Sequence, residues 1–204
     1  MRRKTFDALM ATGGLVLAII LVVAGGLLVW AHSFADTSVR TQLVQQKIDF
    51  PAKGSPSLKA DPEITKYVTP YAGQQVVNGQ QAAVFANHYI AVHMRGIAAG
   101  QTYSEVSGQY IALQAQNPND PKLAALSGQR QALFMGETLR GMLLNAYAFW
   151  KLGQIAAIAA IASFITAGLM FLLSALGFWH LRRVAPEAVV LPNLGAHTPA
   201  PVEV

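Results

Sequence analysis

The residues best suited to chemistry lie together in one stretch, FANHYIAVHMRG, which carries two histidines, an arginine, an asparagine and a tyrosine. A helix that binds a metal ion prefers histidines four residues apart, because positions i and i+4 share a face. His88 and His93 are five residues apart and therefore about 140° apart around an α-helix. We interpret the group as polar contacts across a helical bundle or with water, and a pH-sensitive contact through one histidine is the next alternative. This polar patch consists of Asn87, His88, Tyr89, His93 and Arg95.

The other chemical groups do not form a recognisable catalytic set. The sequence has no cysteine, which excludes thiolate catalysis, disulfides and cysteine-bound metals. It has no nucleophile elbow, zinc-protease, phosphate-loop or dinucleotide-binding motif. Glu105 is explained as a helix-capping residue, and Glu137 as the partner of Arg140 three residues on. We therefore expect no enzyme, no catalytic residue, no bound metal and no cofactor, and an enzyme that uses His88 or His93 is the weakest hypothesis.

The composition is that of a small membrane protein. Of the 204 residues, 53% are hydrophobic and 12% are charged, and the mean hydropathy is +0.36. Two apolar segments, 8–31 and 155–179, carry no charged residue, and each is long enough to cross a hydrocarbon core of about 30 Å. The first segment is too long for the apolar part of a signal peptide, so we expect it to be retained as an anchor.

Basic residues at the two chain ends set the expected topology. By the positive-inside rule both termini are cytoplasmic, and the region between the apolar segments lies outside the plasma membrane. The net charge of +5 therefore reports topology, and we expect no nucleic-acid partner. The basic residues that flank the segments are Arg2, Arg3, Lys4, Arg182 and Arg183.

We expect an all-α protein with two transmembrane helices and an extracytoplasmic helical bundle. The second span continues without a break from a long outer helix that begins near Pro121, where Asp120 can cap it. Prolines and glycines interrupt the stretch 50–79, which we interpret as a connector with one short helical turn at 62–68. The expected parts are 1–32 (cytoplasmic N-terminus and first span), 33–154 (extracytoplasmic domain), 155–180 (second span) and 181–204 (flexible cytoplasmic tail).

Local signals place the remaining helices of the outer domain. The first helix is expected to extend beyond the membrane over 33–48, because its apolar periodicity continues there without glycine or proline. A helix over 80–98 follows Asn78, which can cap it. Thr102 and Glu105 match a capping box, so we expect another helix to begin there.

The long helix carries a face of small and apolar residues at alternating steps of three and four. This face is uncharged and continues from the aqueous half into the second span, and a similar series occurs in the first span. Five charged residues, Lys122, Arg130, Glu137, Arg140 and Lys151, fall on the opposite side, which we expect to face water. We call the uncharged face the small-residue seam and expect it to pack against another helix. Its members are Gly14, Ala18 and Gly25 in the first span, and Met135, Leu139, Met142, Gly153, Ala156, Ala160, Ser163 and Ala167 in the long helix.

Three stretches carry a resemblance to known proteins: RRKTFD before the first span, YAGQQVVNGQQAAVFANHYIAVHM, and the FWHLRR end of the second span. They resemble a family of small actinobacterial membrane proteins with two spans and about this length. Some members are labelled aromatic ring-opening dioxygenase, but such enzymes hold iron with two histidines and a carboxylate, and the sequence suggests no such trio on one face. The resemblance implies a setting in the actinobacterial cell envelope.

Two functions from different classes are consistent with these observations. The first is a non-enzymatic, membrane-anchored protein that acts as an accessory or structural subunit of an envelope membrane assembly, or as a homo-oligomer, through the small-residue seam. The alternative is an extracytoplasmic module that binds a lipid or another small ligand, with the connector lying over a pocket between the outer helices. Membrane lipids are expected partners in both cases.

Overall fold

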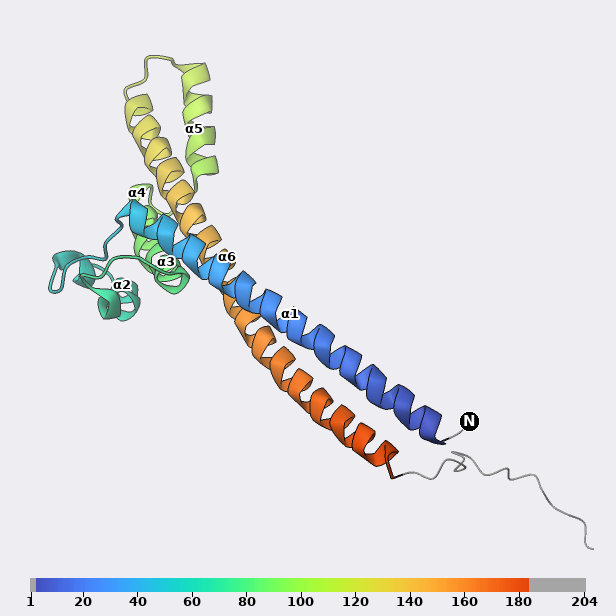
Figure 1. The fold of residues 1–204 in the computed structure, drawn as a ribbon. Helices are drawn as coiled ribbons and strands as arrows, with labels where there is room; N and C mark the ends of the chain where they lie inside the picture. Colours follow the sequence, from blue (N-terminus) through green and yellow to red (C-terminus); the bar gives the residue numbers. More distant parts are fainter. Residues whose placement is uncertain (1–2, 184–204) are drawn as a thin grey trace, which may run out of the picture. The chain divides into compact units, whose positions relative to one another are not determined.

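The computed structural model describes residues 3–183, and over these residues the chain is all-helical, with no β-strand (Figure 1). The predicted fold class is confirmed to that extent. The flexible tail predicted for 181–204 falls mostly on residues 184–204, which lie outside the described residues. The elements are α1 (Arg3–Gln46), the 3₁₀-helix η1 (Pro56–Lys59), α2 (Pro62–Tyr67), the 3₁₀-helix η2 (Thr69–Tyr71), α3 (Gly79–Phe85), the π-helix η3 (Ala86–Ile90), α4 (Ala91–Ile97), α5 (Tyr103–Gln116) and α6 (Lys122–Leu181).

Two of these helices, α1 and α6, are long and apolar enough to cross a membrane. They have 44 and 60 residues. At a rise of about 1.5 Å per residue, each is longer than the roughly 30 Å of a hydrocarbon core, so only part of each helix is needed to span it. The long helix begins where it was predicted, directly after Pro121. The Asp120 side chain accepts a hydrogen bond from the backbone N–H of Lys122 at 2.9 Å.

The chain divides into two compact units, and α1 and α6 contribute to both. One unit, which we call the helix pair, consists of the described residues within 1–29 and 157–204. The other, which we call the head, is 30–156. In the helix pair, α1 and α6 run side by side in opposite directions (Figure 1).

The head is held together by a core to which every one of its helical segments contributes. α1 supplies Val39 and Leu43, and α6 supplies Leu133 and Leu143, all of them buried. The connector contributes as well, because Ile64 of α2 is only 1% exposed. The other fully buried large side chains of the core are Val68, Val76 and Val106. The connector is therefore part of the packed head.

The connector 50–79 is more ordered than the single helical turn predicted for it. It contains η1, α2 and η2, and each has a proline at its first or second position, where the missing N–H is not needed. The N–H of Phe50 donates to the Gln74 carbonyl at 2.9 Å, and that of Val76 donates to the Ile48 carbonyl at 2.8 Å. These two hydrogen bonds hold the ends of the connector together. The prolines that interrupt the apolar periodicity begin its short helices.

The helix predicted over 80–98 is present but is divided into α3, η3 and α4. Asn78 caps it as predicted, since its Oδ1 accepts from the N–H of Gln81 at 2.9 Å. The π-helical segment η3 changes the angular relation between residues before and after it, because a π turn holds more residues than an α turn. The predicted capping box of Thr102 and Glu105 begins α5 and is confirmed.

Gly79, the first residue of α3, provides a test of the packing in the head. A Cβ at this position would collide with the Trp150 side chain of α6. We expect Gly79→Ala to lower the free energy of unfolding by about 1–3 kcal/mol, because α3 and the Trp150 side chain must move apart to make room for the added methyl group. Gly108→Ala in α5 is the control, since a Cβ there meets nothing within 4 Å. Thermal unfolding followed by circular dichroism should show a lower midpoint for Gly79→Ala alone, and equal midpoints would contradict the contact.

Candidate functional site

In the helix pair, the small-residue seam lies between α1 and α6. Ala18, Ala160 and Ala167 are 0%, 2% and 1% exposed. The hydroxyl of Ser163 donates to the backbone carbonyl of Leu21 at 2.8 Å. A hydrogen bond from a short side chain to the backbone of the opposite helix requires the two backbones to lie close together. Small residues at the contact allow this approach.

Two glycines of α1 leave space that side chains of α6 occupy. A Cβ at Gly14 would lie 2.6 Å from Ser174 Oγ. A Cβ at Gly25 would lie 2.8 Å from the ring of Phe164. Real Cβ atoms do not approach other atoms this closely, so any larger residue at either position would displace its neighbour on α6.

The seam residues at the end of the head are also in contact with α1. A Cβ at Gly153 would lie 2.8 Å from the Cβ of Ala35, and the Gly153 carbonyl oxygen is 3.0 Å from Nδ1 of His32. Ala156, the last residue of the head, is partly buried.

Further into the head, the remaining seam residues are exposed. Met135, Leu139 and Met142 are 61%, 37% and 60% exposed, so they do not form an internal packing face. Gly136 faces α4 instead, because a Cβ there would lie 2.7 Å from Met94 Sδ. One residue corresponds to about 100° around an α-helix, so the packed face is rotated by roughly that angle. These three residues were predicted to pack against another helix, and that contact stays a prediction, because within the head α6 packs against several short elements through a different face.

Arg140 does not lie on a purely solvent-facing side of α6, as its place among the charged residues predicted. Its Nη1 is 3.3 Å from Glu137 Oε2, which is the pairing expected from the sequence. Its Nη2 also donates to Oδ1 of Asn87 in η3 at 3.4 Å. Its Nε is buried and has no hydrogen-bond partner among the described residues. Arg140 therefore lies against η3, because the head packs on this side of α6 as well.

The polar patch predicted from FANHYIAVHMRG is organised by a residue that sequence reasoning missed, Glu63 of α2. His88 Nδ1 lies 2.9 Å from Glu63 Oε1, and Arg95 Nη2 donates to Glu63 Oε2 at 2.5 Å. The His88 ring also stacks on Tyr67, with 3.9 Å between ring centroids. Glu63 and His88 are 25 residues apart and share no periodic pattern, so the sequence gives no signal for this contact. We call Glu63, His88 and Arg95 the ion-pair cluster.

The other members of the polar patch lie outside this cluster. Asn87 contacts Arg140, as described above. Tyr89 packs against Phe85, with 4.9 Å between ring centroids. His93 Nδ1 lies 2.7 Å from the Tyr89 carbonyl oxygen, one helical turn back along the chain. The structure therefore brings His88 and Arg95 together but does not bring His93 to them.

The charges of the ion-pair cluster favour a role in holding the head together over a role in acid–base catalysis. The pKa of Glu63 is held below its ordinary value, mainly by the hydrogen bond from Arg95 and then by that from His88. A carboxylate with a lowered pKa is a weak base, and both of its oxygens already accept from neighbouring side chains. Within residues 3–183 there is no group of three or more His, Cys, Asp or Glu side chains placed to hold a metal ion. The cluster thus attaches α2 to η3 and α4.

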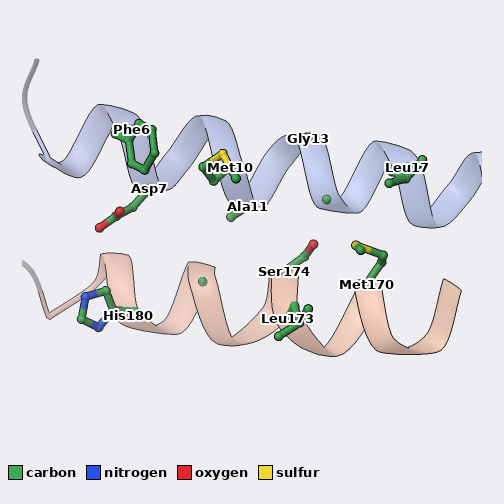
Figure 2. A pocket seen from close by; sticks show the side chains of 12 residues that line it. Phe6, Asp7, Met10, Ala11, Gly13, Leu17, Met170, Leu173, Ser174 and His180 are labelled. Atoms are coloured by element: carbon green, nitrogen blue, oxygen red, sulfur yellow. The ribbon is translucent and has the colours of Figure 1, made fainter. Parts of the chain in front are cut away.

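The helix pair contains a cavity of about 520 Å³ between α1 and α6, which is open at the surface, where lining side chains such as Met10 and Leu173 are exposed (Figure 2). Asp7 and His180 lie at one end, on opposite helices, and Leu17 and Met170 lie at the other. Ser174 stands between the two ends, with its hydroxyl directed from α6 towards α1 (Figure 2). The alternative function expected a ligand pocket in the outer bundle, whereas this cavity belongs to the helix pair.

Comparison with protein-family models, with curated proteins and with solved structures finds no match for this chain. The resemblance to small actinobacterial membrane proteins therefore stays a prediction.

The lowered pKa of Glu63 predicts a pH-dependent contribution to stability. Its folded-state pKa lies below the ordinary value of about 4.5, so the contribution is fully present above about pH 4.5 and is lost as the pH falls through the folded-state pKa. We expect Glu63→Gln to lower the thermal midpoint at pH 7. The difference from the unmodified chain should shrink as the pH is lowered from 4.5 to 3. A difference that stays constant over this range would contradict the role given to the carboxylate.

Proposed function

We propose that this chain is a non-enzymatic, membrane-anchored helical protein that acts by assembling with a protein partner. The assembly is either an envelope membrane complex in which the chain is an accessory or structural subunit, or a homo-oligomer. In this proposal the helix pair crosses the plasma membrane, both termini are cytoplasmic and the head is extracytoplasmic. The length and apolar character of α1 and α6, together with basic residues at both chain ends, support this placement.

The observation that carries the proposal is an exposed apolar stripe on the head portion of α6. Its members, Met135, Leu139, Met142 and Phe149, are 61%, 37%, 60% and 41% exposed. They follow one another at steps of four, three and seven residues, which is the spacing of a helix-to-helix contact. A helix in water that presents such a stripe gains stability when another apolar surface covers it. We call these residues the exposed stripe.

A groove of about 380 Å³ lies beside the exposed stripe and would help to receive a partner helix. Its apolar lining includes Leu43 of α1 and Met142 and Phe149 of α6. The amide side chains of Gln46 and Asn145 also line it. Such a groove offers apolar contact together with hydrogen-bonding groups, which is the usual combination at a protein interface.

The ion-pair cluster fits this proposal as a device that keeps the head in one shape. It joins α2 to η3 and α4, and its member His88 also stacks on the Tyr67 ring of α2. A head with a fixed shape presents its groove and exposed stripe without an ordering cost when a partner binds.

The assembly can be tested by placing charge on the exposed stripe. Met135→Lys together with Met142→Lys would bury two unpaired charges in the proposed interface, so we expect at least tenfold weaker assembly. Because both side chains are exposed, the thermal midpoint of the head should hardly change. Ala148→Lys, at an exposed position off the stripe, is the matched control.

The measurement is native mass spectrometry of the protein extracted in mild detergent, with co-purified proteins identified. We expect an oligomer or a complex for the unmodified chain and for Ala148→Lys, and its loss for the double variant. A strictly monomeric unmodified chain without a co-purifying protein would contradict the proposal, as would equal loss in the control.

A further inference from the structure

The cavity in the helix pair changes character along its length. One end has Asp7 and His180, and ten residues further along α1, about 15 Å at the helical rise, the lining is Leu17 with Met170 of α6. In the proposed membrane placement the polar end lies at the cytoplasmic interface and the apolar end lies within the hydrocarbon core. This gradient matches an amphiphile with its headgroup at the interface and its chain directed inward.

Two polar atoms of lining residues have no hydrogen-bond partner within residues 3–183. Asp7 Oδ2 and Ser174 Oγ are both buried, and neither has a hydrogen-bond partner among the described residues. Ser174 is only 3% exposed, and its hydroxyl is directed towards α1, where it lies against Gly14 (Figure 2). A buried polar group without a partner lowers stability, so a ligand that supplies a hydrogen bond here would be favoured.

The charges around the polar end indicate the kind of headgroup. Arg3 and Lys4 stand just before Asp7 in the sequence, and Arg182 and Arg183 follow α6. Basic side chains at this end attract a phosphate, whereas the free oxygen of Asp7 requires a donor such as an ammonium group. A phosphoethanolamine headgroup carries both groups, with one acyl chain free to follow the apolar lining.

We propose that this cavity binds a phospholipid with a primary-amine headgroup, its ammonium at Asp7, its phosphate near the basic residues and an acyl chain between Leu17 and Met170. The inference rests on the membrane placement of the proposed function, but it is independent of the assembly through the exposed stripe.

Two glycines of α1 allow the cavity to be filled selectively. A Cβ at Gly13, which lines the cavity, meets nothing within 4 Å, so Gly13→Leu places a side chain in the space a lipid chain would use. Gly26 is equally open but does not line the cavity, and Gly26→Leu is the matched control. Asp7→Asn keeps the shape of the side chain but removes the negative charge that an ammonium group would contact.

The test is native mass spectrometry of the full-length protein titrated in detergent with phosphatidylethanolamine, phosphatidylcholine and phosphatidylglycerol that have identical acyl chains. We expect phosphatidylethanolamine to bind at least tenfold more tightly than phosphatidylcholine, which has no N–H donor. Asp7→Asn should remove this preference. Gly13→Leu should abolish lipid adducts, and Gly26→Leu should leave them unchanged.

Equal binding of phosphatidylethanolamine and phosphatidylcholine would overturn the inference, as would preference for phosphatidylglycerol. Unchanged adducts in Gly13→Leu would also overturn it. If Gly13→Leu altered the oligomeric mass and not the lipid adducts, the cavity would be a protein interface and the inference would be wrong. The same mass spectra test the assembly proposal separately, because they give the number of protein chains in each ion as well as the number of bound lipids.

Discussion

Close contact between the small-residue faces of α1 and α6 is the interaction on which the rest of the structure depends. Within hydrocarbon, apolar side chains gain little by leaving lipid, so helices associate through close packing and hydrogen bonds. Ala18, Ala160 and Ala167 let the backbones approach, and the hydroxyl of Ser163 then reaches the Leu21 carbonyl. The same two helices frame the cavity, whose lining is complete only when both are present.

In the head, α6 has more neighbours than in the helix pair, and this changes which of its faces is buried. Leu133 and Leu143 enter the core, and Gly136 lies against Met94 of α4. Packing on this side leaves Met135 and Met142 exposed. One face of α6 is thus buried in the core of the head, and another apolar face of the same helix is exposed. The proposed assembly follows from that difference.

Much of the architecture could be predicted from the sequence because it rests on local signals. Asp120, Asn78 and Thr102 each mark the start of a helix, and in each case the structure contains the capping hydrogen bond. The two long helices follow from apolar length alone. The order within the connector was under-predicted, because prolines were counted as breaks although they also begin helices.

The contacts of the polar groups could not be predicted, because they join segments that share no pattern in the sequence. Glu63 meets His88 and Arg95 only after the connector has packed on η3 and α4. The exposure of Met135 likewise depends on which neighbours α6 acquires in the head. Periodicity identifies an apolar face, but it does not tell whether the same chain or a partner covers that face.

The contact between α1 and α6 is tested most directly by a disulfide within the helix pair, since the sequence has no cysteine of its own. A Cβ at Gly177 would lie 3.1 Å from that of Ala11, a few tenths of an ångström below the range of about 3.5–4.5 Å in disulfides, so Ala11→Cys with Gly177→Cys should cross-link after a small shift of the two helices. Gly13→Cys with Gly168→Cys, both at open positions, is the control and should not. Under mild oxidation, electrophoresis and intact mass should show an intrachain disulfide in a monomer for the first pair alone. Failure to cross-link, or a disulfide only between two chains, would contradict the account.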